Sequence, residues 1–224
     1  MKRIRILVTG LISAAIFSTI LFIAAGRIAY MQGWLFLSTN IVTTLIHFLA
    51  FPKNNDLLEE RSTVKEGAKS WDKLLLGISA IIYFITIVVA GLDSGRFHWS
   101  PYCNVWVNAV GVLLAIAGQL IFLTALRENR FFSSIVRIQK EKGHTVCDTG
   151  IYRIIRHPGY SGMTLSLAGV PFITGSVWSA IPTSVAIIIL FVRTVLEDNT
   201  LKNELDGYIE YTRKTRFKLI PFIW

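Results

Sequence analysis

Arg193 and Glu197 follow directly after a stretch of 36 residues, 157–192, that contains no Asp, Glu, Lys or Arg. Residues four apart on a helix share one face, so this guanidinium and this carboxylate would project together at the end of an apolar segment. One interpretation is an interfacial salt bridge, which contributes less than about 1 kcal/mol. The other is a binding pair, in which Arg193 holds an anionic group through its planar fork of donors and Glu197 holds a polar or cationic ligand. The spacing alone leaves both open.

A second group of polar side chains lies upstream, in the turn-rich segment 139–160. Its histidines and tyrosines are His144, Tyr152, His157 and Tyr160. Pro158 restricts His157 to extended conformations and suits the first turn of a following helix. Backbone N–H groups are unpaired at such a helix start and can meet an acceptor. A lone histidine here would indicate interfacial packing, whereas four such side chains in one loop favour a binding site.

The distribution of charge predicts the elements that position these residues. Of the 224 residues, 53% are hydrophobic and only 17% are charged, against about 25% in a typical soluble domain. Because a helix needs about 20 apolar residues to cross a bilayer, the charge-free stretches predict an all-α, polytopic membrane protein with five to six spans. These stretches are 6–26, 28–52, 74–92, 97–126 and 157–192.

The net charge of +9 is mainly a topology signal. If successive spans alternate in direction, 21 of the 23 basic residues and 13 of the 14 acids lie on one side, and Asp93 is the one acid on the other. The positive-inside rule makes the charged side cytoplasmic, together with the N-terminus. We therefore expect no nucleic-acid partner. Cys103 and Cys147 fall on opposite sides, so we expect no disulfide and no metal site from them.

The chain is expected to form a single membrane domain, 1–224, in three parts. Residues 1–52 would form a two-span hairpin; a signal peptide is disfavoured there, because no clean cleavage site follows the first stretch. Residues 53–126 would add two spans. Residues 127–224 would contribute a cytoplasmic loop, a helical hairpin that breaks near Gly175, and an amphipathic C-terminal helix. The hairpin could be simple kinked packing or the wall of a ligand cavity, and the C-terminal helix could merely lie on the membrane surface.

The segment 150–160, Arg193-x-x-x-Glu197 and Gly207-Tyr208-x-x-Tyr211 together resemble the isoprenylcysteine carboxyl methyltransferase family. Phospholipid N-methyltransferases are more distant relatives. The resemblance extends over about three quarters of the chain, through Leu57-Leu58-x-Glu60-Arg61, Trp71-Asp72-Lys73, Asn129-x-Phe131-Phe132 and Leu219-Ile-Pro221-Phe-Ile-Trp224.

The resemblance implies a methyltransferase that binds S-adenosyl-L-methionine on the cytoplasmic side and methylates a lipophilic acceptor, most simply the carboxylate of a prenylated cysteine or an isoprenoid-like molecule. Arg193 would contact that substrate and is the implied catalytic residue. The implied cofactor-binding residues are Gln139, His144, Thr145, Val146, Cys147, Tyr152, His157, Pro158, Gly159, Tyr160 and Glu197. The family often carries two consecutive Glu residues where this chain has Glu197-Asp198, so the role of Asp198 stays open.

Two other functions remain possible on the sequence. Membrane reductases of the sterol-reductase type share a related C-terminal architecture and bind NADPH there, and a non-catalytic scaffold would use the same loop as an interfacial segment. The chain has no Gly-rich dinucleotide fingerprint, P-loop, zinc-protease motif or nucleophile elbow. It also has no acid or base in mid-span of the kind that ion pathways require, so transport by a charged relay is disfavoured.

Overall fold

The computed structural model describes residues 2–50, 67 and 69–224. The part of the family motif at 57–61 lies outside these residues. The long helices are α1 (Lys2–Ala25), α2 (Met31–Ala50), α4 (Ser70–Ala90), α5 (Val105–Glu128), α6 (Pro158–Thr174) and α7 (Ala180–Glu204). The short ones are the π-helical turn η1 (Gly91–Phe97), the 3-10 turns η2 (Lys140–Lys142) and η3 (Gly150–Arg153), and α8 (Tyr208–Lys214). The described chain is thus helical, as predicted.

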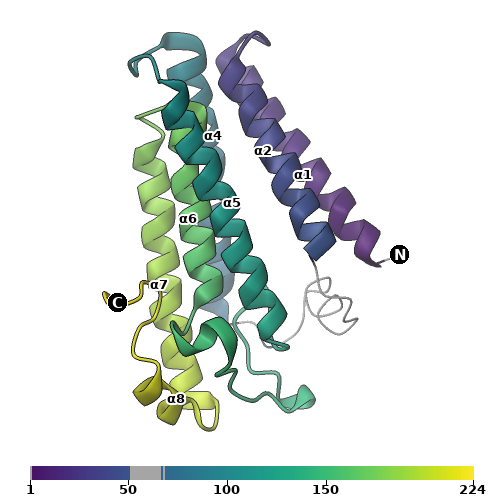
Figure 1. Ribbon diagram of the computed structural model, residues 1–224, viewed down its shortest axis with the longest axis vertical. Helices are drawn as coiled ribbons and strands as arrows, with labels where there is room; N and C mark the ends of the chain where they lie inside the picture. The colour runs from purple at the N-terminus through teal and green to yellow at the C-terminus, as the bar shows by residue number, and fades with distance from the viewer. Residues whose placement is uncertain (1, 51–66, 68) are drawn as a thin grey trace.

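Five helical segments of the described chain are long and apolar enough to cross a membrane, namely α1, α2, α4 with η1, α5 and α7. The sixth long helix, α6, has 17 residues and packs inside the bundle beside α5 and α7 (Figure 1). The prediction of five to six spans with a C-terminal hairpin is confirmed. The hairpin turns at Gly175, whose φ of 65° lies in the left-handed region that favours glycine.

Glycines explain why α5 and α6 form the tightest helix pair. A Cβ atom on Gly162 would lie 2.5 Å from the carbonyl oxygen of Gly118, and one on Gly169 would lie 2.6 Å from that of Gly111. Only hydrogen side chains permit this approach, because any larger residue would push the two backbones apart. Gly162 and Gly169 therefore let α5 and α6 pack closely, whereas Gly175 ends α6.

Asp93 joins the helices at the end of the bundle opposite the loop between α5 and α6 (residues 129–157). Its carboxylate is fully buried and accepts hydrogen bonds from the Ser100 amide at 2.7 Å, the Ser100 hydroxyl at 2.6 Å and the Ser176 hydroxyl at 2.6 Å. A buried carboxylate is tolerated only when its oxygens are paired in this way. The one acid that the sequence placed on this side thus joins η1 to the α6–α7 turn.

The structure refines two element boundaries. The first eight residues of the 97–126 stretch lie before α5, which begins after Asn104, whose side chain accepts a hydrogen bond from the Trp106 amide at 3.1 Å as an N-cap. The amphipathic tail helix is two pieces, because α7 continues to Glu204 and α8 starts only after Gly207, with φ 79°.

Candidate functional site

A cavity of about 740 Å³ lies between the helices and is lined at one end by the loop between α5 and α6, residues 129–157. This volume lies within the range of small-molecule sites. Its loop end is lined by ten of the predicted site residues, His144, Thr145, Val146, Cys147, Tyr152, His157, Gly159, Tyr160, Arg193 and Glu197. From there the cavity continues between α2, α4, α5, α6 and α7 as far as Val170 and Ile173. One end is therefore aromatic and charged, and the other lies between membrane-spanning helices.

Two predicted site residues are not among those that line the cavity. Gln139 is fully buried, and its side-chain Nε2 donates to the carbonyl oxygen of Phe131 at 2.7 Å. Its backbone N–H donates to His144 Nδ1 at 3.3 Å, so Gln139 stabilises the loop without lining the cavity. Pro158 is buried at the first position of α6, where its missing N–H costs nothing. A cofactor contact of either residue stays a prediction.

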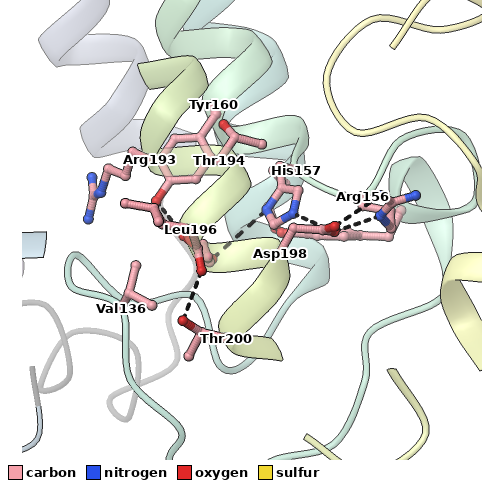
Figure 2. A network of polar contacts seen from close by, with 12 residues as sticks. Val136, Arg156, His157, Tyr160, Arg193, Thr194, Leu196, Asp198 and Thr200 are labelled. Carbon is pink, nitrogen blue, oxygen red and sulfur yellow. Dashed lines mark hydrogen bonds and ion pairs between the residues drawn. The ribbon is translucent and has the colours of Figure 1, made fainter. Parts of the chain in front are cut away.

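Asp198 is the centre of a buried polar cluster beside the cavity (Figure 2). Its carboxylate accepts from Arg156 Nε at 2.8 Å and Nη2 at 3.2 Å, from the Tyr208 hydroxyl at 3.0 Å and from Lys202 Nζ at 2.8 Å. His157 Nε2 lies 3.3 Å from the same carboxylate. Because an ionised carboxylate can only accept, this nitrogen carries a proton. Burial raises the pKa of Tyr208, so that its hydroxyl remains a donor.

Glu197, the neighbour of Asp198, faces the cavity instead. The Tyr160 hydroxyl donates to its Oε2, and its Oε1 lies 4.0 Å from His157 Nδ1. The His157 ring stands between Tyr160 and the Asp198–Arg156 pair (Figure 2). One face of α7 thus holds the His157 ring in place, and the adjacent residue presents a carboxylate to whatever occupies the cavity.

Arg193 forms its ion pair with Asp72 of α4 rather than with Glu197. Its Nε lies 2.7 Å from Asp72 Oδ1, and its Nη2 donates both to Asp72 Oδ2 at 3.3 Å and to the Ser134 carbonyl oxygen at 3.0 Å. Both side chains are buried, and Asp72 also accepts from the Val136 amide at 2.9 Å. Of the two interpretations that the spacing left open, the Arg193–Glu197 salt bridge is therefore not the one that forms. Arg193 still lines the cavity.

Four residues that complete the site were not assigned a role from the sequence, Asp72, Arg156, Tyr208 and Tyr211. All four stand within the motifs that carry the family resemblance, but nothing in the local pattern shows their long-range contacts. Tyr211, for example, donates to the Tyr152 carbonyl oxygen at 2.6 Å. The one signal available was Asp72 itself, an acid next to a predicted span that would need a cationic partner if buried.

The cavity-lining Cys147 is a protonated thiol rather than a nucleophile. Burial raises the pKa of this thiol, and the smaller opposing effect of the hydrogen bonds with Thr149 does not cancel the shift. A reactive cysteine needs the opposite shift, toward the thiolate. Cys147 therefore serves as part of the wall.

Comparisons with known proteins point in the same direction as this geometry. A family model described as phospholipid methyltransferase matches residues 106–205. Protein-S-isoprenylcysteine O-methyltransferase B of Arabidopsis thaliana is 29% identical over 154 residues, which are 67% of this chain and 73% of the relative. Protein-S-isoprenylcysteine O-methyltransferase A of the same plant is 26% identical over the same shares.

Among solved structures, the eukaryotic intramembrane Ras methyltransferase ICMT (isoprenylcysteine carboxyl methyltransferase) superimposes with a TM-score of 0.55. The match covers 94% of this chain and 74% of that one, at 18% sequence identity, so it establishes the shared fold. The chain is therefore similar in sequence and in fold to the isoprenylcysteine carboxyl methyltransferases. These similarities support an integral-membrane methyltransferase rather than a reductase or a scaffold.

We expect the Asp72–Arg193 pair to be a strongly coupled element of this methyltransferase. Asp72→Ala and Arg193→Ala should each lower the free energy of unfolding by about 3–5 kcal/mol, because each leaves a buried charge without its partner. The double variant should lose less than the sum, by about 1–3 kcal/mol. Unfolding in mixed detergent micelles, followed by circular dichroism, measures all three.

The exposed pair Lys69–Glu204, with 2.7 Å between Nζ and Oε1, is the matched control. Its alanine variants should change the free energy of unfolding by less than about 1 kcal/mol. Additive losses from Asp72→Ala and Arg193→Ala would show that the two side chains do not act as a unit.

Proposed function

We propose that this protein transfers a methyl group from S-adenosyl-L-methionine to the carboxylate of a prenylated cysteine, at the loop end of the cavity. The proposal rests on the lining of the cavity. At its loop end the cavity is lined by the Glu197 carboxylate, the Arg193 guanidinium and several aromatic rings, and it continues from there between membrane-spanning helices. The names of the Arabidopsis relatives support this acceptor class.

The residues at the loop end fit the proposed cofactor. When bound, S-adenosyl-L-methionine supplies an electrophilic methyl group on a sulfonium cation and also carries an ammonium group. Glu197 offers a carboxylate for a cationic group, and the ring of Tyr208, which also lines the cavity, offers the negative π-surface that cations prefer. The stretch from His144 to Cys147 forms the opposite wall of the same cavity. A neutral, purely apolar pocket would not match such a ligand.

The proposed reaction needs no general base, which agrees with the residues present. An α-carboxyl group has an ordinary pKa of about 3.3–3.7, so the acceptor is already ionised at neutral pH. What the protein must supply is alignment of the acceptor oxygen and exclusion of water. The rigid cluster around Asp198 and His157 and the enclosed position of the cavity provide these two conditions.

Arg193 is suited to hold the acceptor. Its Nε and Nη2 are engaged with Asp72 and Ser134, while its Nη1 makes no hydrogen bond within the described part of the chain. A guanidinium that is already fixed by one carboxylate can offer its remaining donors to another without losing further side-chain entropy. Asp72 is thereby a positioning residue, and the chamber beyond Arg193 would receive the hydrocarbon tail of the acceptor.

A transfer assay on the purified chain in lipid nanodiscs tests this function. Radiolabelled S-adenosyl-L-methionine should label N-acetyl-S-farnesylcysteine, and the label should be released by mild base, as expected of a methyl ester. The matching carboxamide should stay unlabelled, because it lacks the nucleophilic oxygen. Transfer to a lipid amine in place of the carboxylate, or binding of NADPH without binding of S-adenosyl-L-methionine, would overturn the proposal.

Glu197→Gln should weaken the binding of S-adenosyl-L-methionine by roughly 10- to 150-fold. This corresponds to the loss of one charge-assisted contact, about 1.5–3 kcal/mol. Isothermal titration in detergent measures the dissociation constant. Glu204→Gln, on the same helix but paired with the exposed Lys69, is the control and should leave affinity unchanged. Retention of affinity within a few-fold in Glu197→Gln would show that this carboxylate does not face the cofactor.

The orientation in the membrane belongs to the same proposal, because the cofactor must reach the loop from the cytoplasm. The two thiols, Cys103 and Cys147, are free and partly exposed, and they precede α5 and follow it, respectively. An impermeant maleimide added to intact cells should modify Cys103 and spare Cys147, and inverted vesicles should show the reverse. Labelling of Cys147 from outside would contradict a cytoplasmic site.

A further inference from the structure

The segment after α8 folds back along α7 rather than leaving the protein. Figure 1 shows the C-terminus beside α7 and well away from α8. The Trp224 ring stacks on Phe191 of α7, with 5.1 Å between ring centroids and 18° between planes. Phe191 belongs to the charge-free stretch 157–192, so the turn formed by residues 217–224 reaches the apolar part of the helix.

This turn is closed on itself and presents an apolar surface outward. The amides of Lys218, Leu219 and Ile220 all donate to the Trp224 carbonyl oxygen, at 2.9, 2.9 and 3.0 Å. The turn exposes 87% of Phe222 and 77% of Ile223. Exposed apolar clusters of this kind mark surfaces that contact a membrane or a partner.

Cations precede the apolar turn in the sequence, and one within the turn contacts its tryptophan. Arg213, Lys214 and Arg216 are exposed just before the turn, and the Lys218 ammonium lies 4.4 Å from the centre of the Trp224 ring. A tryptophan and apolar tips combined with several cations are the composition of an interfacial anchor, in which the rings enter the headgroup boundary and the cations remain among anionic phosphates. This charge pattern favours lipid over an apolar protein partner.

The same turn is bonded directly to the backbone of the candidate site. The Arg156 amide donates to the Phe217 carbonyl oxygen at 2.9 Å, and the His157 amide donates to that of Lys218 at 2.9 Å. The Ser161 hydroxyl adds a bond of 2.6 Å to the carbonyl oxygen of Leu219. Any displacement of the turn would therefore pull on the segment that positions His157.

We propose that the 217–224 turn is a membrane anchor, which inserts Phe222 and Ile223 into the adjoining leaflet and thereby braces the backbone of Arg156 and His157. Its partner is a phospholipid bilayer with anionic headgroups. The anchor does not depend on the identity of the methyl acceptor, because it rests on contacts outside the cavity.

Insertion is tested by a spin label on Phe222→Cys, in the full chain with Cys103→Ser and Cys147→Ser, in nanodiscs of phosphatidylcholine and phosphatidylglycerol. The label should relax faster with oxygen than with a water-soluble nickel complex. A label on Asn203→Cys, exposed at the end of α7, should show the opposite order. Access of nickel at position 222 would place the turn in water, and access of neither reagent would indicate a protein cover such as a second copy. Either result overturns the proposal.

Bracing is tested without any assay of activity, by hydrogen–deuterium exchange in the same nanodiscs. Phe222→Ser combined with Ile223→Ser should raise the exchange rate of the Arg156 and His157 amides several-fold, because their acceptors lie in the displaced turn. Ile209→Ser is the matched control, since Ile209 is also an exposed apolar residue (49%) but lies on α8. Unchanged exchange in the double variant, or an equal rise in the control, would overturn the bracing role.

Discussion

Asp198 is the carboxylate on which the arrangement of this site depends. Fully buried, it accepts from Arg156, Tyr208 and Lys202 and orients His157. A buried carboxylate without such partners would cost several kcal/mol, so the cluster forms completely or the segment does not fold. Its partners come from the loop before α6, from α7 itself and from α8. One side chain thereby joins the loop before α6, 42 residues earlier in the chain, to α7 and α8.

The adjacent acids of α7 divide two tasks because successive residues on a helix point about 100° apart. Asp198 turns into the protein and organises it, whereas Glu197 turns into the cavity and meets Tyr160. The shorter Asp suits the inward position, since a neighbouring guanidinium and imidazole already reach it at 2.8 and 3.3 Å. The question that the sequence left open about Asp198 is thus answered by packing: it positions the groups around the cavity and is itself absent from the cavity wall.

The spans and the hairpin were predictable because membrane-spanning helices consist of long stretches without charged residues, which can be recognised in the sequence. The break at Gly175 was predictable for a similar reason, since few residues adopt a positive φ. The partner of Arg193 was not, because Asp72 lies 121 residues away and no local spacing encodes a contact at that distance. Gln139 shows a different limit of sequence analysis. Its position in the motif can be recognised, but only the fold shows that its side chain bonds to the Phe131 carbonyl oxygen and does not line the cavity.

The pairing of Arg193 with Asp72 also determines how charge is distributed along the cavity. Since these two buried groups compensate each other, Glu197 is left as the carboxylate whose hydrogen bond is to a neutral hydroxyl. In a site removed from bulk water, a single charge of this kind acts over a longer range than it would at a surface. A cationic methyl donor would gain most beside Glu197, and an anionic acceptor would gain most beside Arg193, four residues earlier on α7. Under the proposed function, the spacing of Arg193 and Glu197 would separate two binding positions along one helix, at the boundary between the loop and the membrane.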